Sequence, residues 1–355
     1  MKKESNKISN GVNEKSNKIS NMVKKIFIIW GREAELSRYL AEGLGAELKQ
    51  VYIKKWGKVK LPALIRYGLQ GFKTLFILAA QKPETVIVQN PPIFAALVCY
   101  FYCTIAGAKL AIDSHTAAFL DRKWIFFHWL FKFAAKRAVL NTCHNFKNLA
   151  VLKKWGIKEA MVIQFYNPVY KEEELRQEMK DKEISELVKK SRLPIMMVNR
   201  FAGDDDWPTV LAAAALLPEA NFFITGNPPS SLKEKLPANV CLTGYLPHGE
   251  FMKLMWRCRL ILAFTLRPDT VLWSVREIMA LAKPFITTDS EILRHYFGEV
   301  ALFTKSDPGQ LKERILSALK EEGRIKEKIK IFLEKDKERW KKEISLANKI
   351  LNNKK

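Results

Sequence analysis

The sequence has few cysteines, and they form no metal-binding pattern. Its five cysteines are scattered among apolar neighbours, with no Cys-x-x-Cys pair and no Cys/His spacing that suits zinc. We therefore expect buried free thiols, as in a reducing cytosol, and no metal site. The first 21 residues lack the apolar stretch of a signal peptide, so we expect a cytoplasmic protein.

A long apolar run is also lacking. An almost wholly apolar stretch, Ile93–Ala108, is shorter than the roughly 20 residues that a transmembrane helix needs. It lies between two strand-like runs, and Gly107 stands at its end. We interpret it as a helix buried against a sheet, and a membrane span is the alternative.

Acidic residues are scarce in the first half of the chain. Residues 1–170 hold 27 basic and 10 acidic residues, whereas residues 171–355 hold 33 and 27, and the net charge is +23. A positive excess predicts an anionic partner: nucleic acid, membrane lipid or a phosphorylated substrate. Because no helix–turn–helix or zinc pattern is visible, we expect no nucleic acid as partner. An anionic membrane surface is the partner that we favour.

Strand-like and helix-like stretches alternate along the chain in two series. This alternation predicts the α/β class, with two Rossmann-like, doubly wound parallel-sheet domains facing a cleft. Ligands of such sheets bind beyond the carboxyl ends of the strands. The expected segments are a disordered polar tail at 1–22, an N-terminal domain at 23–170, a charged linker helix at 171–192, a C-terminal domain at 193–325 and a Lys-rich helix at 326–355. For the tail, a membrane-surface arm is the alternative.

An acid and an imidazole follow one strand of the first series. Asp113 and His115 lie two residues apart at the end of Lys109–Asp113, a position that points into the expected cleft. Such a pair can take a proton from a hydroxyl group, with the carboxylate holding the imidazole. The alternative is a structural Asp that caps the next helix, beside a His that is merely polar.

Two loops of the second series are candidate anion sites. One follows a strand at Asn199–Asp206 and carries Arg200, and the other leads into a helix expected to begin near Thr270. Backbone N–H groups and the helix dipole favour phosphate at such places. The aspartates at 204–206 would repel phosphate, so we expect them to cap the helix or to face solvent.

An aromatic stretch with basic neighbours lies at Trp124–Phe133. Its composition is that of a helix in a membrane interface, with Trp124, Phe127 and Lys132 as membrane-facing residues. A core helix with basic ends is the alternative, and both remain open.

These motifs together resemble a bacterial GT-B glycosyltransferase of the family 4 type, within the nucleotide-sugar glycosyltransferase and glycogen phosphorylase superfamily. The resemblance covers about Lys24 to Gly323. It is carried by Asn90-Pro-Pro-Ile, Ala111-Ile-Asp-Ser-His, Thr225-Gly226, Leu242-Thr-Gly-Tyr-Leu-Pro247, Asp269 through Pro284, and Thr288-Asp289-Ser290. It implies a donor held mainly by the C-terminal domain, an acceptor over the N-terminal domain, and no metal ion or cofactor.

The resemblance also implies roles for single residues. Glu277 matches the acidic residue that binds the donor ribose, and Gly31 with Arg32 matches a loop facing donor phosphate or acceptor. This chain departs from relatives at Asp269, where a longer acid is common, and at Ser274, where glycine is common. The expected donor-binding residues are Arg200, Gly226, Pro247, Arg267, Asp269, Thr270, Ser274 and Glu277.

The function expected from this resemblance is sugar transfer from a nucleoside-diphosphate sugar to an acceptor hydroxyl. The resemblance and the positive charge of the N-terminal half together favour a lipid-linked or envelope glycan as acceptor, at the cytoplasmic face of the cell membrane. The alternatives are a sugar-nucleotide epimerase of the same fold, or a non-catalytic partner in a glycosylation complex.

Overall fold

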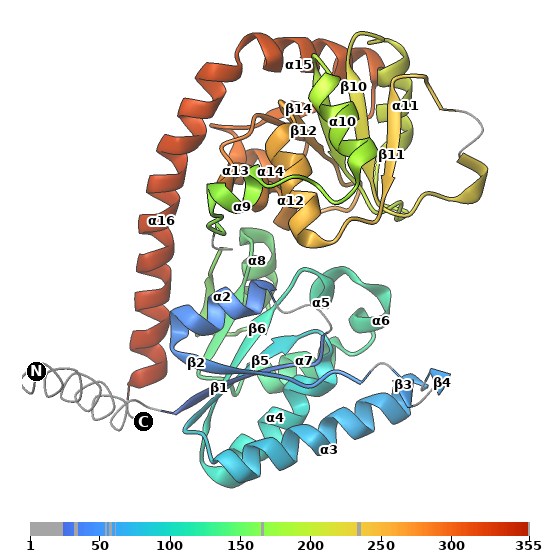
Figure 1. The fold of residues 1–355 in the computed structure, drawn as a ribbon. Helices are drawn as coiled ribbons and strands as arrows, with labels where there is room; N and C mark the ends of the chain where they lie inside the picture. Colours follow the sequence, from blue (N-terminus) through green and yellow to red (C-terminus); the bar gives the residue numbers. More distant parts are fainter. Residues whose placement is uncertain are drawn as a thin grey trace, which may run out of the picture. The chain divides into compact units, whose positions relative to one another are not determined.

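Most of the chain is described by the computed structural model shown in Figure 1. The described residues are 24–31, 35–53, 55–56, 59–60, 62–164, 167–232 and 236–353. The predicted tail at 1–22 lies outside them. Internal contacts divide the chain into two compact units: unit 1 is Met1–Gln164 with Lys342–Lys355, and unit 2 is Phe165–Lys341.

Unit 1 is built on a six-stranded sheet in the order β2-β1-β5-β6-β7-β8, and all its neighbouring strands are parallel. Its central strands are almost wholly buried, as expected of a sheet covered on both faces. The strands are β1 (Lys25–Ile29), β2 (Ala46–Gln50), β5 (Thr85–Asn90), β6 (Lys109–Ser114), β7 (Leu140–Cys143) and β8 (Ala160–Val162). A separate antiparallel pair consists of β3 (Lys55–Trp56) and β4 (Val59–Lys60).

The helices of unit 1 connect these parallel strands. They are α2 (Glu35–Leu44), α3 (Ala63–Gln81), α4 (Ile93–Ala106), α5 (Ala117–Leu120), α6 (Arg122–Ile125), α7 (His128–Ala135) and α8 (Phe146–Lys154). The apolar stretch that begins at Ile93 forms α4, which ends where Gly107 adopts φ +67°. Glycine takes this left-handed conformation without steric cost, so it terminates the helix. No helix within the described ranges is long and apolar enough to cross a membrane.

Unit 2 repeats the architecture with the strand order β11-β10-β9-β12-β13-β14, again parallel throughout. Counted along the chain from β9, this is the order 3-2-1-4-5-6 of a Rossmann sheet, which reverses between β9 and β12. The strands are β9 (Pro194–Val198), β10 (Asn221–Thr225), β11 (Val240–Gly244), β12 (Leu260–Ala263), β13 (Phe285–Thr288) and β14 (Leu302–Thr304). The predicted α/β class with two Rossmann-like parallel sheets is confirmed.

Helices flank this second sheet as well. They are α11 (Trp207–Ala215), α12 (His248–Arg257), α13 (Trp273–Ala280), α14 (Glu291–Phe297) and α15 (Pro308–Lys320), with a short 3₁₀ turn at Ser230–Leu232.

The predicted single linker helix at 171–192 is wrong. The structure has two short helices there, α9 (Glu172–Arg176) and α10 (Lys182–Lys190), and both belong to unit 2. The helical path is interrupted between them. The Asp181 carboxylate accepts a hydrogen bond from the backbone N–H of Ile184 and caps the start of the second helix.

The last helix, α16 (Glu322–Asn352), contributes residues to both units. Its final part supplies unit 1 with polar contacts to β1 and to the helix that follows it. Asn348 Oδ1 accepts from the buried ammonium of Lys25 at 2.6 Å, and Asn348 Nδ2 donates to the Gly43 carbonyl at 3.1 Å. The buried Lys25 also donates to the Leu44 carbonyl, so its ammonium has partners from two elements.

Candidate functional site

A buried acid and two imidazoles meet at the carboxyl edge of the unit 1 sheet. Asp113 lies on β6, opposite Thr142 of β7, and only 1% of it is exposed. Thr142 Oγ1 donates to Asp113 Oδ1 at 2.6 Å. The Nε2 atoms of His115 and His144 both lie 3.3 Å from the carboxylate, the first from Oδ2 and the second from Oδ1. We call these three side chains the Asp–His–His cluster.

Two contacts of His144 bear on its charge. Its Nδ1 lies 2.8 Å from the Ile163 carbonyl oxygen, which only accepts, so Nδ1 carries a hydrogen. Its Nε2 faces a carboxylate oxygen, which also favours a hydrogen there. An imidazole with hydrogens on both nitrogens is a cation, so His144 forms a buried ion pair with Asp113.

The pKa shifts agree with this assignment. Burial raises the pKa of Asp113, but the charge of His144 and the hydrogen bonds of both imidazoles outweigh it and hold that pKa far below its usual range. Burial lowers the pKa of His144, yet the Asp113 charge and hydrogen bond raise it overall. For His115 burial dominates and lowers the pKa, with the His144 charge acting in the same direction. These directions favour a carboxylate, an imidazolium and a neutral imidazole in the cluster.

His115 is the member of the cluster that solvent reaches. Its side chain is 19% exposed, against 5% for His144 and 1% for Asp113. The two imidazole rings pack edge to face at a centroid distance of 4.7 Å, and the His115 backbone N–H donates to the Asn90 carbonyl. His115 is therefore fixed in place and presents a neutral imidazole, which is the form that accepts a proton.

Sequence reasoning missed His144. The signal was present, because His144 directly follows β7 just as Ser114 and His115 end and follow β6. Neighbouring parallel strands end at the same edge of a sheet, so polar residues after consecutive strands are candidates for one site.

A metal ion is the other ligand to consider for these atoms. Asp113, His115 and His144 each offer one ligand atom, and these atoms lie within 4.8 Å of one another. A zinc or similar ion would need the lone pair of His144 Nε2. The Asp113 carboxylate raises the pKa of His144, which favours a proton over a metal ion at Nε2. The Nδ1 contact with the Ile163 carbonyl is also one that metal-binding histidines make, so the geometry suits either ligand.

The first strand of unit 1 contributes less to this edge. Gly31 follows β1, and its carbonyl accepts from Gln50 Nε2 at 2.8 Å. Arg32, predicted beside it, lies outside the described residues.

In unit 2, the loops after β9 and β12 meet at the point where the strand order reverses. The Leu266 backbone N–H donates to the Asp204 carbonyl at 2.7 Å, and Thr265 Oγ1 lies 3.3 Å from Asp204 Oδ2. The Arg267 N–H in turn donates to Thr265 Oγ1. This reversal is where Rossmann sheets bind their ligands, so the two loops predicted as anion sites form one region.

The aspartates of the first loop hold its backbone. Asp205 Oδ2 accepts the backbone N–H groups of Arg200 and Ala202, each at 2.9 Å, and Asp206 Oδ1 accepts from Thr209 Oγ1 at 2.8 Å. The side chain of Arg200 is exposed beside them. The predicted capping is not observed: Asp206 stands at the N-cap of α11 without a side-chain cap hydrogen bond, and Asp205 binds N–H groups of the loop instead.

Gly226 is required where β10 ends. Its φ is +99°, and a Cβ there would lie 2.6 Å from the Asn199 carbonyl oxygen and 2.8 Å from the Arg200 Cα. No side chain fits that space, so Gly226 lets β10 pack against the loop after β9. Gly226 therefore serves this region by allowing close backbone packing against Asn199 and Arg200.

The helix of the second loop begins later than the sequence indicates. We predicted a start near Thr270, but α13 begins at Trp273, since Asp269 has φ +52° and Leu272 is extended. Thr270 Oγ1 donates to the Pro268 carbonyl, outside the helix. Ser274 therefore lies in the first turn of α13, where backbone N–H groups are unpaired within a helix.

Glu277 lies buried on α13 and has a partner that the sequence did not reveal. His248 Nε2 lies 2.8 Å from Glu277 Oε1, and Tyr170 Oη lies 3.5 Å from the same oxygen. His248 opens α12 directly after the predicted Pro247, which is exposed and caps that helix. Most of His248 is exposed, with 59% of its side chain accessible.

Comparisons with known proteins agree with this architecture. Residues 178–342 match the family model for glycosyl transferases group 1, and no curated protein matches the chain. HepE from Anabaena, solved with UDP and glucose, is 12% identical with a TM-score of 0.64, over 88% of this chain and 95% of that one. Sucrose-phosphate synthase from Thermosynechococcus elongatus is 13% identical with a TM-score of 0.67, over 92% and 99%.

The fold is GT-B. A third GT-B neighbour, assigned as a UDP-N-acetylglucosamine 2-epimerase from Listeria monocytogenes, is 13% identical with a TM-score of 0.60, over 87% of this chain and 91% of that one. The matched region 178–342 contains every predicted donor-binding residue of this GT-B chain, from Arg200 to Glu277. Membership of family 4 stays a prediction.

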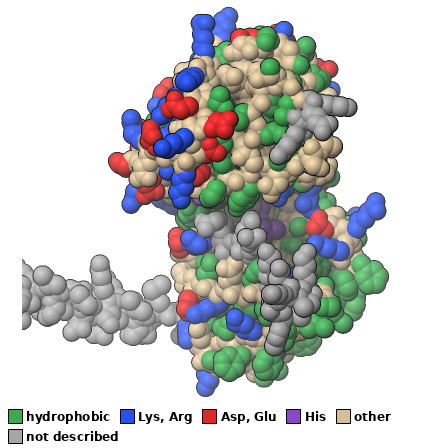
Figure 2. All heavy atoms as spheres, turned by 45° about the vertical axis from the view of Figure 1, so that its right-hand side comes forward, with side chains coloured by type: hydrophobic (Ala, Val, Ile, Leu, Met, Phe, Trp, Pro, Cys, Tyr) green, Lys and Arg blue, Asp and Glu red, His purple; other side chains and the backbone are tan. Residues whose placement is uncertain are grey.

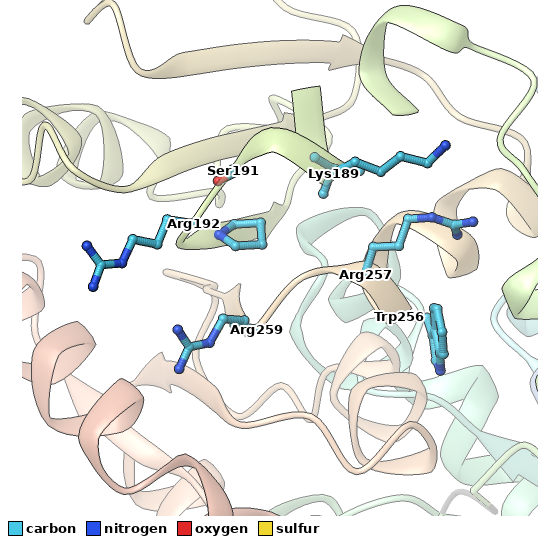
Figure 3. Close-up of a pocket in the computed structure, with 8 residues that line it drawn as sticks. Lys189, Ser191, Arg192, Trp256, Arg257 and Arg259 are labelled. Carbon is cyan, nitrogen blue, oxygen red and sulfur yellow. The ribbon is translucent and has the colours of Figure 1, made fainter. Parts of the chain in front are cut away.

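A cavity on the opposite edge of unit 2 is separate from this region of the GT-B fold. It measures about 520 Å³, and Figure 3 shows basic side chains and a tryptophan around it. It is lined by Val188, Lys189, Ser191, Arg192, Pro194, Trp256, Arg257 and Arg259. Pro194 is the first residue of β9, so the cavity lies at the amino end of that strand. Lys189 pairs with Glu178 and Arg259 with Glu322, so much of its positive charge is already compensated.

Burial contradicts the membrane-facing prediction for Trp124 and counts against it for Phe127. Trp124 is 5% exposed and belongs to the core of unit 1, and Phe127 is half-buried with its ring 5.1 Å from that of Phe94. Lys132 is exposed, and its contact with a membrane stays a prediction. The aromatic stretch is not one helix: α6 ends at Ile125 and α7 begins at His128, and this break turns Trp124 and Phe127 inward.

Proposed function

We propose that the protein is a glycosyltransferase that moves a sugar from a nucleoside-diphosphate sugar to an acceptor hydroxyl. The observation that carries the proposal is the Asp–His–His cluster, a fixed neutral imidazole at the carboxyl edge of a sheet in a GT-B chain. The glycosyl transferases group 1 match over unit 2 supports a nucleotide-sugar donor. Among its structural neighbours, HepE was solved with UDP and glucose.

His115 acts in this proposal as the group that activates the acceptor. Its Nε2 lies 3.3 Å from the Asp113 carboxylate, so we place the proton of the neutral ring on Nε2 and take Nδ1 as the basic atom. The acceptor hydroxyl gives its proton to His115 as its oxygen attacks the anomeric carbon, and the bond from that carbon to the diphosphate oxygen breaks. The positive charge of His144 offsets the negative charge of Asp113. Asp113 therefore does not hold His115 in its protonated form before the acceptor proton is transferred.

Unit 2 binds the donor in this proposal. The leaving diphosphate gains negative charge, which fixed dipoles and cations stabilise. The first turn of α13 with Ser274 offers backbone N–H groups, and Arg200 and Arg267 lie on the two loops that meet at the strand-order reversal. Glu277, oriented by His248, is the ribose partner.

The acceptor that we propose is a lipid-linked or envelope glycan at the cytoplasmic face of the membrane. Support comes from the charge, because residues 1–170 carry the larger part of the positive excess. A polyprenyl-linked acceptor bears a pyrophosphate and lies in an anionic surface, and both attract this half of the chain. We propose that neither a metal ion nor a cofactor takes part.

A donor screen tests the proposal. The purified protein is heated with nucleoside diphosphates and with a panel of nucleotide sugars, and a true donor raises the melting temperature. The same sugars are then supplied with membrane lipid extracts, and radiolabel transfer to lipid is measured in the presence and absence of EDTA. Transfer supports the proposal. Interconversion of the sugar without any acceptor would instead identify an epimerase, and failure to bind any donor would indicate a non-catalytic partner.

A further inference from the structure

Helix α3 of unit 1 is apolar on the side that should be polar. Its inward residues, such as Thr74 and Leu78, are fully buried, as expected of a helix covering a sheet. Its outward side carries Phe72 and Phe76, which are 75% and 70% exposed. Leu64, Ile65 and Leu75 are exposed on the same helix. The outward face of a helix in a soluble domain is ordinarily polar, so this side is built to contact something apolar.

The exposed apolar surface continues over the neighbouring helices. Tyr102 of α4 donates to the Leu78 carbonyl of α3, and Tyr100 of α4 packs edge to face on Phe133 of α7 at 5.1 Å. These contacts place α4 between α3 and α7. The exposed apolar residues on this part of the surface are Phe101 and Ile105 of α4, Ile125 and Phe126 at the end of α6, and Trp129 and Phe133 of α7. We call the exposed residues of α3, α4, α6 and α7 the apolar face.

Positive charge accompanies the apolar face. None of α3, α4, α6 and α7 contains an Asp or a Glu. Their Lys and Arg residues and those just after α7 are Arg66, Lys73, Arg122, Lys123, Lys132, Lys136 and Arg137. Figure 2 shows hydrophobic side chains gathered along the lower edge and right side of unit 1, with Lys and Arg side chains near them.

We propose that the apolar face docks unit 1 onto an anionic lipid membrane. Exposed aromatic and aliphatic side chains between basic ones are what the lipid–water interface binds, with the apolar groups entering the headgroup boundary and the cations meeting anionic lipids. A second copy of the chain fits the face less well, because two such surfaces would bring like charges together. The proposal builds on the lipid-linked acceptor of the proposed function, yet it concerns lipid binding alone.

Flotation with vesicles tests the docking without any sugar substrate. The full chain is mixed with vesicles of phosphatidylcholine alone, or of phosphatidylcholine with phosphatidylglycerol as the anionic lipid. The wild type should float with the anionic vesicles, and added salt should weaken that binding. A triple variant carries Phe72→Ser, Phe76→Ser and Trp129→Ser. It should bind at least about tenfold more weakly, because three apolar side chains that would enter the lipid are lost.

A matched control separates docking from general loss of surface apolar groups. It carries Leu216→Ser, Leu316→Ser and Ile331→Ser, three exposed apolar positions of unit 2, and should bind vesicles like the wild type. Unchanged melting temperatures check that both triple variants are folded. Wild type that stays unbound, or a face variant that binds like the wild type, would overturn the proposal. So would a dimer that sedimentation detects in the wild type and that the face variant lacks. Donor binding in the thermal screen is read independently, so failure of docking and failure of the proposed function are distinguishable.

Discussion

The two units share one architecture but prepare their binding edges by different means. In unit 1 the edge carries charges that are buried and fixed by one another, with Asp113 between two imidazoles. In unit 2 the corresponding edge is made of loop backbone, held by Asp205 and by the close packing at Gly226. A tuned proton acceptor needs a desolvated setting, whereas an anionic ligand needs donors that already point outward. The difference therefore fits the proposed roles, acceptor activation in unit 1 and donor binding in unit 2.

The two units also differ in the charge and the exposed apolar residues of their surfaces. Residues 171–355 are nearly balanced in charge, whereas residues 1–170 have a large basic excess and carry the apolar face. A donor site needs only a few placed groups, while a membrane contact needs an extended surface.

Replacing the proposed base in unit 1 should have the largest effect. His115→Ala is expected to lower kcat/KM by about 10²- to 10⁴-fold, the usual contribution of a positioned general base. The measurement is transfer to the acceptor at saturating and limiting donor. His295→Ala, an exposed imidazole on α14 of unit 2, is the control and should retain activity. Equal loss in both variants would contradict the base assignment.

In unit 2 the feature to test is the close backbone packing at Gly226. Gly226→Ala would place a Cβ against the Asn199 carbonyl in a left-handed conformation, so we expect the free energy of unfolding to fall by about 2 kcal/mol. Donor affinity should fall with it, because the loop after β9 must move. Denaturant unfolding measures the first effect. Gly249→Ala, whose new Cβ meets no atom within 4 Å on α12, is the matched control and should not destabilise.

The donor side should tolerate loss of a single orienting contact. His248→Ala removes the partner of Glu277, so we expect donor affinity to weaken by about fivefold, equivalent to one hydrogen bond of roughly 1 kcal/mol. Donor KM should rise while kcat changes little. A fall in kcat at unchanged KM would place His248 in the chemical step instead.

The smallest effect is a displacement of a pH profile. In the wild type the lowered pKa of His115 keeps it neutral, so the acidic limb of kcat/KM should fall below the ordinary histidine value of about 6.5. His144→Gln removes a positive charge that lowers the pKa of His115, so the limb should move to higher pH. The measured quantity is the pH at which kcat/KM falls to half its maximum, not the maximum itself. A limb that stays in place would show that His144 does not tune the base.

Much of this molecule follows from local sequence, and the exceptions have physical causes. The strands, the α/β class and the pairing of Asp113 with His115 depend on short-range pattern, so the sequence predicts them. His144 joins the site only through the register of β6 with β7, which no local pattern specifies. Trp124 and Phe127 turned inward because the helix breaks at Phe126–Phe127, so the exposed aromatics of this stretch are their neighbours. A long polar turn before α13, with Asp269 at positive φ, likewise shifted the start of that helix.

The division of α16 between the units bears on the order in which the chain matures. During synthesis the ribosome releases residues 1–164 long before residues 342–353, yet the ammonium of Lys25 on the first strand takes one acceptor from Asn348. Lys109, on another strand of that sheet, likewise donates to the carbonyls of Leu351 and Asn353. The first half therefore cannot complete its contacts as it emerges, although N-terminal domains generally fold first. These contacts form only after residues 348–353 have been synthesised.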